Sequence, residues 1–232
     1  MSDLGYSKNV TLQTNSEELE SSYIGVTSKF FTFSKRFIDF SVSLIGLILT
    51  SPIYLILWLI YQFGENKGPL IFKQKRVGKN GELFYIYKFR TMIVDADKKL
   101  KENKVLYQKY IKNNYKLEPD VDPRITKLGG FLRKTSIDEL PQLINVIQGK
   151  MSLVGPRPIV EEELVEYGSK KNQFLSAKPG ITGYWQVSGR SSVGYPERVD
   201  IELYYVQNQS LKLDLKILLK TVILVLLKKG AY

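Results

Sequence analysis

The chain is 232 residues long, carries a formal net charge of +11, and contains neither cysteine nor histidine. The positive charge indicates an anionic partner, such as phosphate groups, nucleic acid or an acidic membrane face. The missing residue types exclude disulfides, thiol nucleophiles and the commonest general base. Any chemistry must therefore use carboxylates, lysine, arginine, tyrosine, hydroxyls or a hard cation held by oxygen ligands.

Residues 1–34 are a polar lead-in without a signal-peptide pattern, and we expect them to be disordered. The apolar run Phe37 to Phe63 follows, and it is long enough to cross a bilayer, which takes about 20 apolar residues. Ser51-Pro52 lies near its middle, where proline removes a helical hydrogen bond, and basic residues flank both ends. These residues leave two arrangements open: a kinked helix that spans the membrane, or a helix that breaks and returns to the same face.

A β-hairpin is predicted between residues 70 and 92, because two runs rich in β-forming residues flank Asn80-Gly81. Alternation in the second run places Lys88 and Arg90 on one face near the strand end. Two cations on one face can bind phosphate, although edge strands also carry such charges to prevent aggregation.

The stretch from residue 131 to residue 147 combines Arg133, an adjacent acid pair, Asp138-Glu139, and apolar residues at helical spacing. It predicts two carboxylates in the first turn of a helix, with cations just upstream. Acids at a helix start often act only as caps. Ser136 with Glu139 matches a capping box, and Asp138 could itself be the N-cap. These residues alone leave capping and catalysis open.

Arg157 lies between Pro156 and Pro158, and prolines on both sides fix the backbone around it. A rigidly held arginine suits phosphate recognition through two parallel hydrogen bonds, while a connector with a solvated arginine is the alternative. Glycine-rich loops at 178–183 and 187–190 predict close approach of backbone amides to a ligand.

Further helices are predicted at 95–117, 196–208 and 211–227. The last of these is mostly apolar but interrupted by charges. It fits an amphipathic helix on a membrane surface, with Lys228 and Lys229 meeting anionic headgroups, or a helix docked on the core.

Several long motifs occur in order along the chain. They are KRFIDFSVSLIGLILTSP, QKRVGKNG, YKFRTM, DPRIT, FLRKTSIDELPQL, MSLVGPRP, KPGITGYWQVSGR and LDLKILLKTV. Together they closely resemble the bacterial sugar transferases, also called monotopic phosphoglycosyl transferases, from about Lys35 to Tyr232. The polar lead-in holds no large membrane domain, so the resemblance is to the small, minimal form.

The resemblance implies a membrane-associated α/β fold. Residues 35–64 would form a re-entrant helix broken at Ser51-Pro52, and residues 65–232 a small catalytic domain with a β-hairpin and interfacial amphipathic helices. It also implies an enzyme on the cytoplasmic face of the bacterial inner membrane. Such an enzyme uses Mg²⁺ to move a sugar-1-phosphate from a UDP-sugar to undecaprenyl phosphate and releases UMP. The reaction initiates exopolysaccharide, capsule or glycoconjugate synthesis.

The resemblance also assigns roles to residues. Asp138 would attack the sugar-proximal phosphate and form a phosphosugar-enzyme intermediate, and Glu139 would bind Mg²⁺. Phosphate and substrate contacts are expected from Lys88, Arg90, Arg133, Pro156, Arg157, Pro158 and Arg190. This chemistry suits a chain without histidine or cysteine, because a carboxylate can be the nucleophile and phosphoryl transfer depends mainly on charge neutralisation. It favours catalysis over capping for the acid pair.

A non-enzymatic basic module that binds a membrane surface or nucleic acid is the rival interpretation. It leaves the acid pair beside cations unexplained, so we expect a phospholipid membrane and no nucleic acid as partners. Residues 187–190 and the Gly-Ala-Tyr ending resemble family members that use UDP-glucose or UDP-galactose rather than N-acetylated sugars. The oligomeric state, including a homo-oligomer, stays open.

Overall fold

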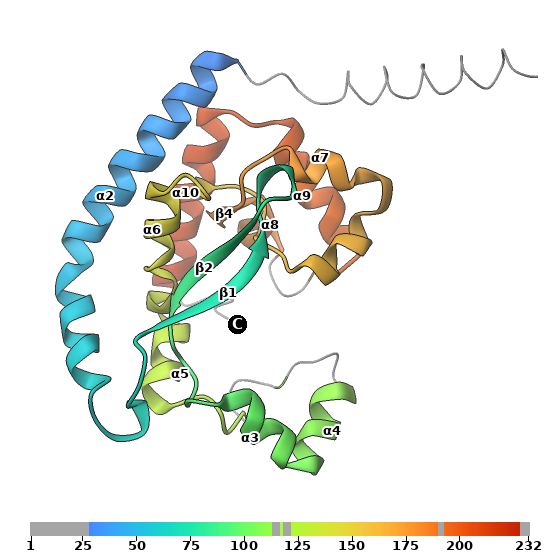
Figure 1. Ribbon diagram of the computed structural model, residues 1–232. Coiled ribbons are helices and arrows are strands. Elements are labelled where there is room, and N and C mark those ends of the chain that lie inside the picture. The colour runs from blue at the N-terminus through green and yellow to red at the C-terminus, as the bar shows by residue number, and fades with distance from the viewer. Residues whose placement is uncertain (1–27, 113–116, 118–121, 190–192, 228–232) are drawn as a thin grey trace, which may run out of the picture.

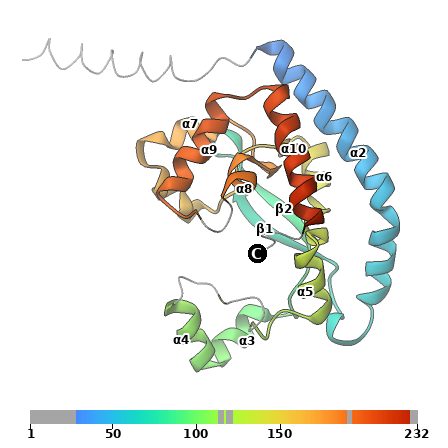
Figure 2. The same cartoon turned by 180° about the vertical axis from the view of Figure 1, so that it is seen from behind.

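The computed structural model describes residues 28–112, 117, 122–189 and 193–227. Within these ranges, a long helix lies along one side of a body built from short helices and two small sheets (Figure 1, Figure 2). The mixture of helices and strands agrees with the predicted class. The predictions for residues 1–27, Arg190 and residues 228–229 lie outside the described residues.

Helix α2, Lys29–Ile60, is the one helix among the described residues that is long and apolar enough to cross a membrane. It begins before residue 35 and runs continuously through Pro52, so the predicted break is not seen. The Ser51 hydroxyl donates to the Ile48 carbonyl at 2.8 Å. That carbonyl is the one left without its helical donor by the missing N–H of Pro52. The helix therefore continues through Pro52 as one curved helix (Figure 1).

The predicted hairpin is confirmed. Strands β1 (Ile71–Val77) and β2 (Leu83–Phe89) pair antiparallel, and the short 3₁₀ segment η2 (Lys79–Gly81) lies between them. Asn80 and Gly81 have φ of 56° and 81°, the left-handed conformation in which asparagine and glycine are favoured. Asn80-Gly81 therefore indicated the turn correctly, because the backbone requires a positive φ at both positions.

Short elements make up the rest of the body, with α3 and α4 projecting from it in both views (Figure 1, Figure 2). They are η1 (Gly64–Asn66), α3 (Ala96–Glu102), α4 (Lys104–Lys112), α5 (Lys127–Lys134), η3 (Ile137–Glu139), α6 (Gln142–Ile147), β3 (Ser152–Val154), η4 (Glu161–Lys170), α7 (Lys171–Leu175), β4 (Gly180–Thr182), α8 (Tyr184–Ser188), α9 (Glu197–Gln207) and α10 (Leu211–Leu226). The helices predicted at 196–208 and 211–227 are confirmed as α9 and α10. The helix predicted at 95–117 is instead divided into α3 and α4.

Strands β3 and β4 pair in parallel. A β-carbon on Gly180 would lie 2.1 Å from the amide nitrogen of Gly155, so only glycine fits where the two backbones meet. The glycine-rich loop at 178–183, which was predicted to approach a ligand, therefore approaches the backbone of another part of the chain. A core cluster surrounds this pair and holds Phe84, Ile86, Val146, Met151, Leu153, Val154, Tyr205 and Ile217.

Both ends of α2 contact this body. Near its start, the Lys35 ammonium donates to the Asp214 carboxylate of α10 at 2.6 Å. Near its end, Leu57 and Tyr61 are buried in a cluster with Phe89 of β2. The outward side of α2 exposes many large apolar side chains, so the helix has one face on the body and an apolar face with no protein cover in the described part of the chain.

Helix α10 also divides its surface between two environments. Ser210 caps it by accepting from the Leu213 amide at 3.2 Å, and Ile217 is buried on the body. Its opposite side exposes Leu215, Leu219, Val222, Ile223, Leu226 and Leu227. One side of the helix is therefore docked on the body, while its amphipathic placement on a membrane surface stays a prediction.

Candidate active site

A cleft of about 1030 Å³ lies between β2, the segment from α5 to α6, and α8. Six of the residues predicted for the site line it: Lys88, Arg90, Arg133, Asp138, Glu139 and Arg157. The fold thus brings together side chains from three separate parts of the sequence. Ser51 and Pro52 lie in α2 and are not among the residues that line the cleft.

The acid pair lies in the 3₁₀ turn η3, between α5 and α6. Ser136 before it has φ of 56° and makes no side-chain cap hydrogen bond, and Pro141 rather than Asp138 occupies the N-cap position of α6. Within this described segment neither capping arrangement is present. The carboxylates are therefore not explained by helix capping.

Helix α5 places Arg133 at the cleft. Thr126 caps the helix by accepting from the Gly129 amide at 2.9 Å. Gly129 lies so close to Thr91 that a β-carbon would be 1.9 Å from the Thr91 carbonyl oxygen. This close packing lets the Arg133 Nε donate to the Thr91 hydroxyl at 2.9 Å, which orients the guanidinium. Burial lowers the pKa of Arg133, while the nearby Asp138 raises it.

The two carboxyl groups have opposite electrostatic environments. Burial raises the pKa of Asp138 to about 6, against the lowering effect of Lys88 and Arg133. Burial would also raise the pKa of Glu139, but the charge of Lys88 and its hydrogen bond at 2.7 Å hold that pKa below its ordinary value. Neighbouring acids whose pKa values move apart are typical of active sites.

The segment around Arg157 is held as predicted. Pro156 and Pro158 are buried while Arg157 is exposed at the cleft. The Arg157 amide donates to the carboxylate of the buried Glu202 at 3.4 Å. Its guanidinium lies 5.8 Å from the centre of the Trp185 ring. The backbone is therefore anchored and the charged group faces the cleft, while its contact with phosphate stays a prediction.

Arg90 lies at the border of the cleft and is held by contacts with the backbone. Its guanidinium donates to the carbonyls of Pro69 at 2.8 Å and Met92 at 2.7 Å, and also to the carbonyl of Asn66. It also stacks on the Tyr61 ring at 4.9 Å. These contacts tie the end of β2 to the segment that leaves α2. The hydrogen bonds of Arg90 thus go to backbone carbonyls that support the site, and its contact with phosphate stays a prediction.

Sequence reasoning missed two residues that line the cleft, Arg76 and Trp185. Arg76 is on β1, where strand alternation places it on the same face as Phe72 and Gln74, which also line the cleft. Burial lowers its pKa, and the like charge of Arg157 lowers it further. The period of β1 could have identified Arg76, whereas nothing in the sequence indicated the position of Trp185 beneath Arg157.

A divalent cation fits this site only in partnership with a substrate. Among the described residues there is no group of three or more acidic side chains that could hold a metal. Mg²⁺ commonly binds through one or two carboxylates together with substrate phosphates. Glu139 supplies such a carboxylate, and Asp95 and Asp97 border the same cleft.

Comparison with known proteins shows similarity over most of the chain. The family model described as "Bacterial sugar transferase" matches residues 30–228. "Undecaprenyl-phosphate galactose phosphotransferase" of Salmonella typhimurium is 47% identical over 203 residues, which are 86% of this chain and 42% of that protein. "Exopolysaccharide production protein ExoY" of Sinorhizobium fredii is 43% identical over 203 residues, 86% of this chain and 88% of that protein. "UDP-galactose-lipid carrier transferase" of Erwinia amylovora is 43% identical over 204 residues, 86% of this chain and 42% of that protein. The chain thus spans less than half the length of two of these relatives and most of the third. All of the described residues that form the cleft lie within the matched region.

Proposed function

The chain belongs to the bacterial sugar transferase family, and from this premise we propose that it transfers a hexose-1-phosphate from a UDP-sugar to undecaprenyl phosphate. The observation that carries the proposal is the pair Asp138-Glu139, whose pKa values are shifted in opposite directions in a cation-lined cleft. The relatives' names support the substrates, since they include undecaprenyl phosphate, UDP-galactose and exopolysaccharide production. We propose galactose or glucose as the sugar, and exopolysaccharide or capsule synthesis as the process that the product enters.

In the proposed reaction, a carboxylate oxygen of Asp138 attacks the phosphorus that bears the sugar. An oxygen–phosphorus bond to Asp138 forms, the phosphoanhydride bond breaks, and UMP leaves with the bonding electrons. A phosphate oxygen of undecaprenyl phosphate then attacks the same phosphorus and releases the Asp138 carboxylate. With a pKa of about 6, Asp138 is mostly ionised near pH 7, and the lipid phosphate is already an anion, so no strong base is required.

The cations of the cleft neutralise the charge on the phosphates. Arg133, held by Thr91, and Arg157, held by its anchored backbone, can each bind phosphate oxygens through charge-assisted hydrogen bonds. Lys88 holds Glu139 in the free protein at 2.7 Å and can share its charge with an incoming phosphate. Such preorganised donors are a major source of transition-state stabilisation in phosphoryl transfer.

We propose Mg²⁺ as the cofactor, held by Glu139 together with the substrate phosphates. The ion would supply charge neutralisation at the diphosphate. Glu139 suits this role because its low pKa keeps it ionised, and it is accessible, with 33% of its side chain exposed. Asp138 is buried and stays available as the nucleophile.

We also propose that the protein enters the membrane from one side only, on the cytoplasmic face. The contact of Lys35 with Asp214 and the burial of Tyr61 against Phe89 hold both ends of α2 on the body that carries the cleft. A helix with both ends on one body supports a re-entrant rather than a spanning path. Basic residues at both ends favour the cytoplasm for that body. The apolar face of α10 would lie on the same membrane surface.

UMP release tests this function. The full chain in mild detergent is incubated with undecaprenyl phosphate, Mg²⁺ and one of UDP-galactose, UDP-glucose or UDP-N-acetylglucosamine. We expect UMP with one of the first two donors, none from Asp138→Asn, and normal release from Asp200→Asn, a control on the exposed surface of α9. A folded wild-type chain that releases no UMP from any donor contradicts the proposal and favours a non-enzymatic basic module.

A further inference from the structure

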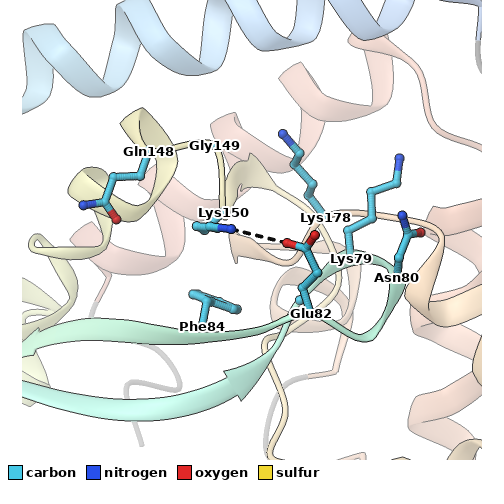
Figure 3. A pocket seen from close by; sticks show the side chains of 9 residues that line it. Lys79, Asn80, Glu82, Phe84, Gln148, Gly149, Lys150 and Lys178 are labelled. Atoms are coloured by element: carbon cyan, nitrogen blue, oxygen red, sulfur yellow. Dashed lines mark hydrogen bonds and ion pairs between the residues drawn. The ribbon is translucent and has the colours of Figure 1, made fainter.

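A second pocket, of about 230 Å³, lies on the side of the body next to the first half of α2 (Figure 3). Among the described residues it shares no lining residue with the large cleft. It is formed by the hairpin turn, the end of α6 and the loop before β4. Its lining residues are Gly78, Lys79, Asn80, Glu82, Phe84, Gln148, Gly149, Lys150 and Lys178. The reaction proposed above does not use any of them.

Cations crowd this pocket. Figure 3 shows the side chains of Lys79 and Lys178 extending towards the side on which α2 passes. A β-carbon on Gly149 would lie 3.5 Å from the Arg36 guanidinium and 3.8 Å from the Lys178 ammonium, so both charges meet at the pocket's edge. Lys150 pairs with the exposed Glu82 at 3.3 Å. In the described part of the chain Lys79 and Lys178 have no ion-pair partner.

Burial and like charges both act on Lys178. Burial lowers its pKa, and the like charges of Arg36, Lys79 and Lys150 lower it further, while Asp39 alone raises it. A half-buried ammonium surrounded by like charges is unfavourable in the free protein. An anion in the pocket would relieve this repulsion and accept charge-assisted hydrogen bonds.

Apolar surface adjoins these charges. The Arg36 guanidinium donates to the carbonyls of Val146 and Ile147 at 2.6 and 2.7 Å, which holds it at the end of α6. It also lies 5.8 Å from the centre of the Phe40 ring on α2. Phe37, one turn before, is 64% exposed. A cationic pocket therefore borders an exposed aromatic surface on a membrane-type helix.

We infer that this pocket binds the phosphate of an anionic phospholipid headgroup, with the acyl chains lying along the exposed side of α2. An amphiphile matches both halves of the site, whereas a free phosphate ion would use only the cationic half. The inference relies on the membrane placement of α2 in the proposed function, but it concerns a site separate from the reacting cleft. Such a lipid would fix the depth of the hairpin turn and of α6 relative to the headgroups.

Native mass spectrometry of the full chain in detergent tests this site. The protein is titrated separately with phosphatidylglycerol, phosphatidylcholine and inorganic phosphate. The test variant is Lys79→Gln with Lys178→Gln, and the control is Lys101→Gln with Lys109→Gln. The control removes the same charge from exposed positions on α3 and α4. Thermal unfolding without lipid checks that both variants fold, and Lys79→Glu, at an exposed position, is a second variant.

We expect one phosphatidylglycerol to bind to wild type and to the control with equal affinity. Its affinity for the test variant and for Lys79→Glu should be at least about tenfold weaker. Phosphatidylcholine should bind no more tightly to wild type than to the test variant. Equal phosphatidylglycerol binding by both double variants overturns the site. Inorganic phosphate that binds wild type as tightly as phosphatidylglycerol overturns the lipid assignment. The lipid-binding measurement needs no turnover. Lipid binding can therefore be confirmed when UMP release is absent, and UMP release can be confirmed when lipid binding is absent.

Discussion

Replacing Asp138 by asparagine should abolish transfer and at the same time stabilise the fold at neutral pH. Asp138 is 8% exposed, and burial raises the pKa of its carboxyl from the ordinary 3.8 to about 6. The folded protein therefore binds this proton more tightly than the unfolded chain does. Stability from this group is present below pH 3.8 and is lost as the pH rises through 6.

The size of the effect follows from the two pKa values. One pKa step corresponds to about 1.4 kcal/mol. The raised pKa therefore costs on the order of 3 kcal/mol of folding free energy at about pH 8, and roughly half of that at about pH 5, where the unfolded chain is ionised and the folded group is still largely protonated. Asparagine is neutral at both values. The stability gain of Asp138→Asn over wild type should therefore grow with pH in this window.

Denaturant unfolding of the full chain in mild detergent, followed by tryptophan fluorescence, measures this difference at the two pH values. Asp200→Asn is the control, because its exposed pair with Lys170 contributes little at either pH. Lower stability of Asp138→Asn than of wild type at both values, or a difference that does not change with pH, would show that the Asp138 carboxyl is not destabilised by burial.

The remaining predictions concern the metal, the phosphate contacts and the topology. Glu139→Gln should lower UMP release severely, and high Mg²⁺ should restore part of it. EDTA should abolish UMP release by the wild type, and full activity in EDTA would refute the metal role of Glu139. Arg133→Ala should cost about 2–4 kcal/mol of transition-state stabilisation in kcat/KM, with poor rescue by lysine, because lysine lacks the planar fork; near-normal kcat/KM would leave Arg133 a surface charge. Single cysteines at Lys29 and Lys67, in a chain that has no cysteine, should both resist an impermeant reagent added outside intact cells. Labelling of position 29 from outside would instead mean that α2 spans the membrane.

Features set by local backbone physics could be predicted from the sequence. The hairpin around Asn80-Gly81 is the clearest case, since two positive φ values demand those residue types. The course of α2 at Pro52 was not predicted in the same way. The Ser51 hydroxyl donates to the carbonyl freed by Pro52, and the helix is continuous where a break was predicted.

Features set by contacts between distant segments could not be predicted. Arg90 has the same strand face as Lys88, yet its guanidinium donates to the carbonyls of Pro69 and Asn66, in a segment that only the folded chain brings near. From the sequence, Gly180 belongs to a predicted ligand-binding loop, whereas in the structure it lies in β4, which pairs with β3. The ion pair of Lys88 with Glu139 joins residues 51 positions apart. Periodicity places each partner on a face but does not say which faces meet.

Mass spectrometry of the enzyme halted between its two half-reactions tests whether a covalent intermediate forms on Asp138. The full chain is mixed with UDP-galactose or UDP-glucose and Mg²⁺ in the absence of undecaprenyl phosphate, quenched in acid and digested. We expect a hexose-phosphate adduct on the peptide that carries Asp138, absent from Asp138→Asn and discharged when undecaprenyl phosphate is added before the quench. UMP release without any adduct at Asp138, or an adduct on another residue that survives in Asp138→Asn, would contradict covalent catalysis by Asp138.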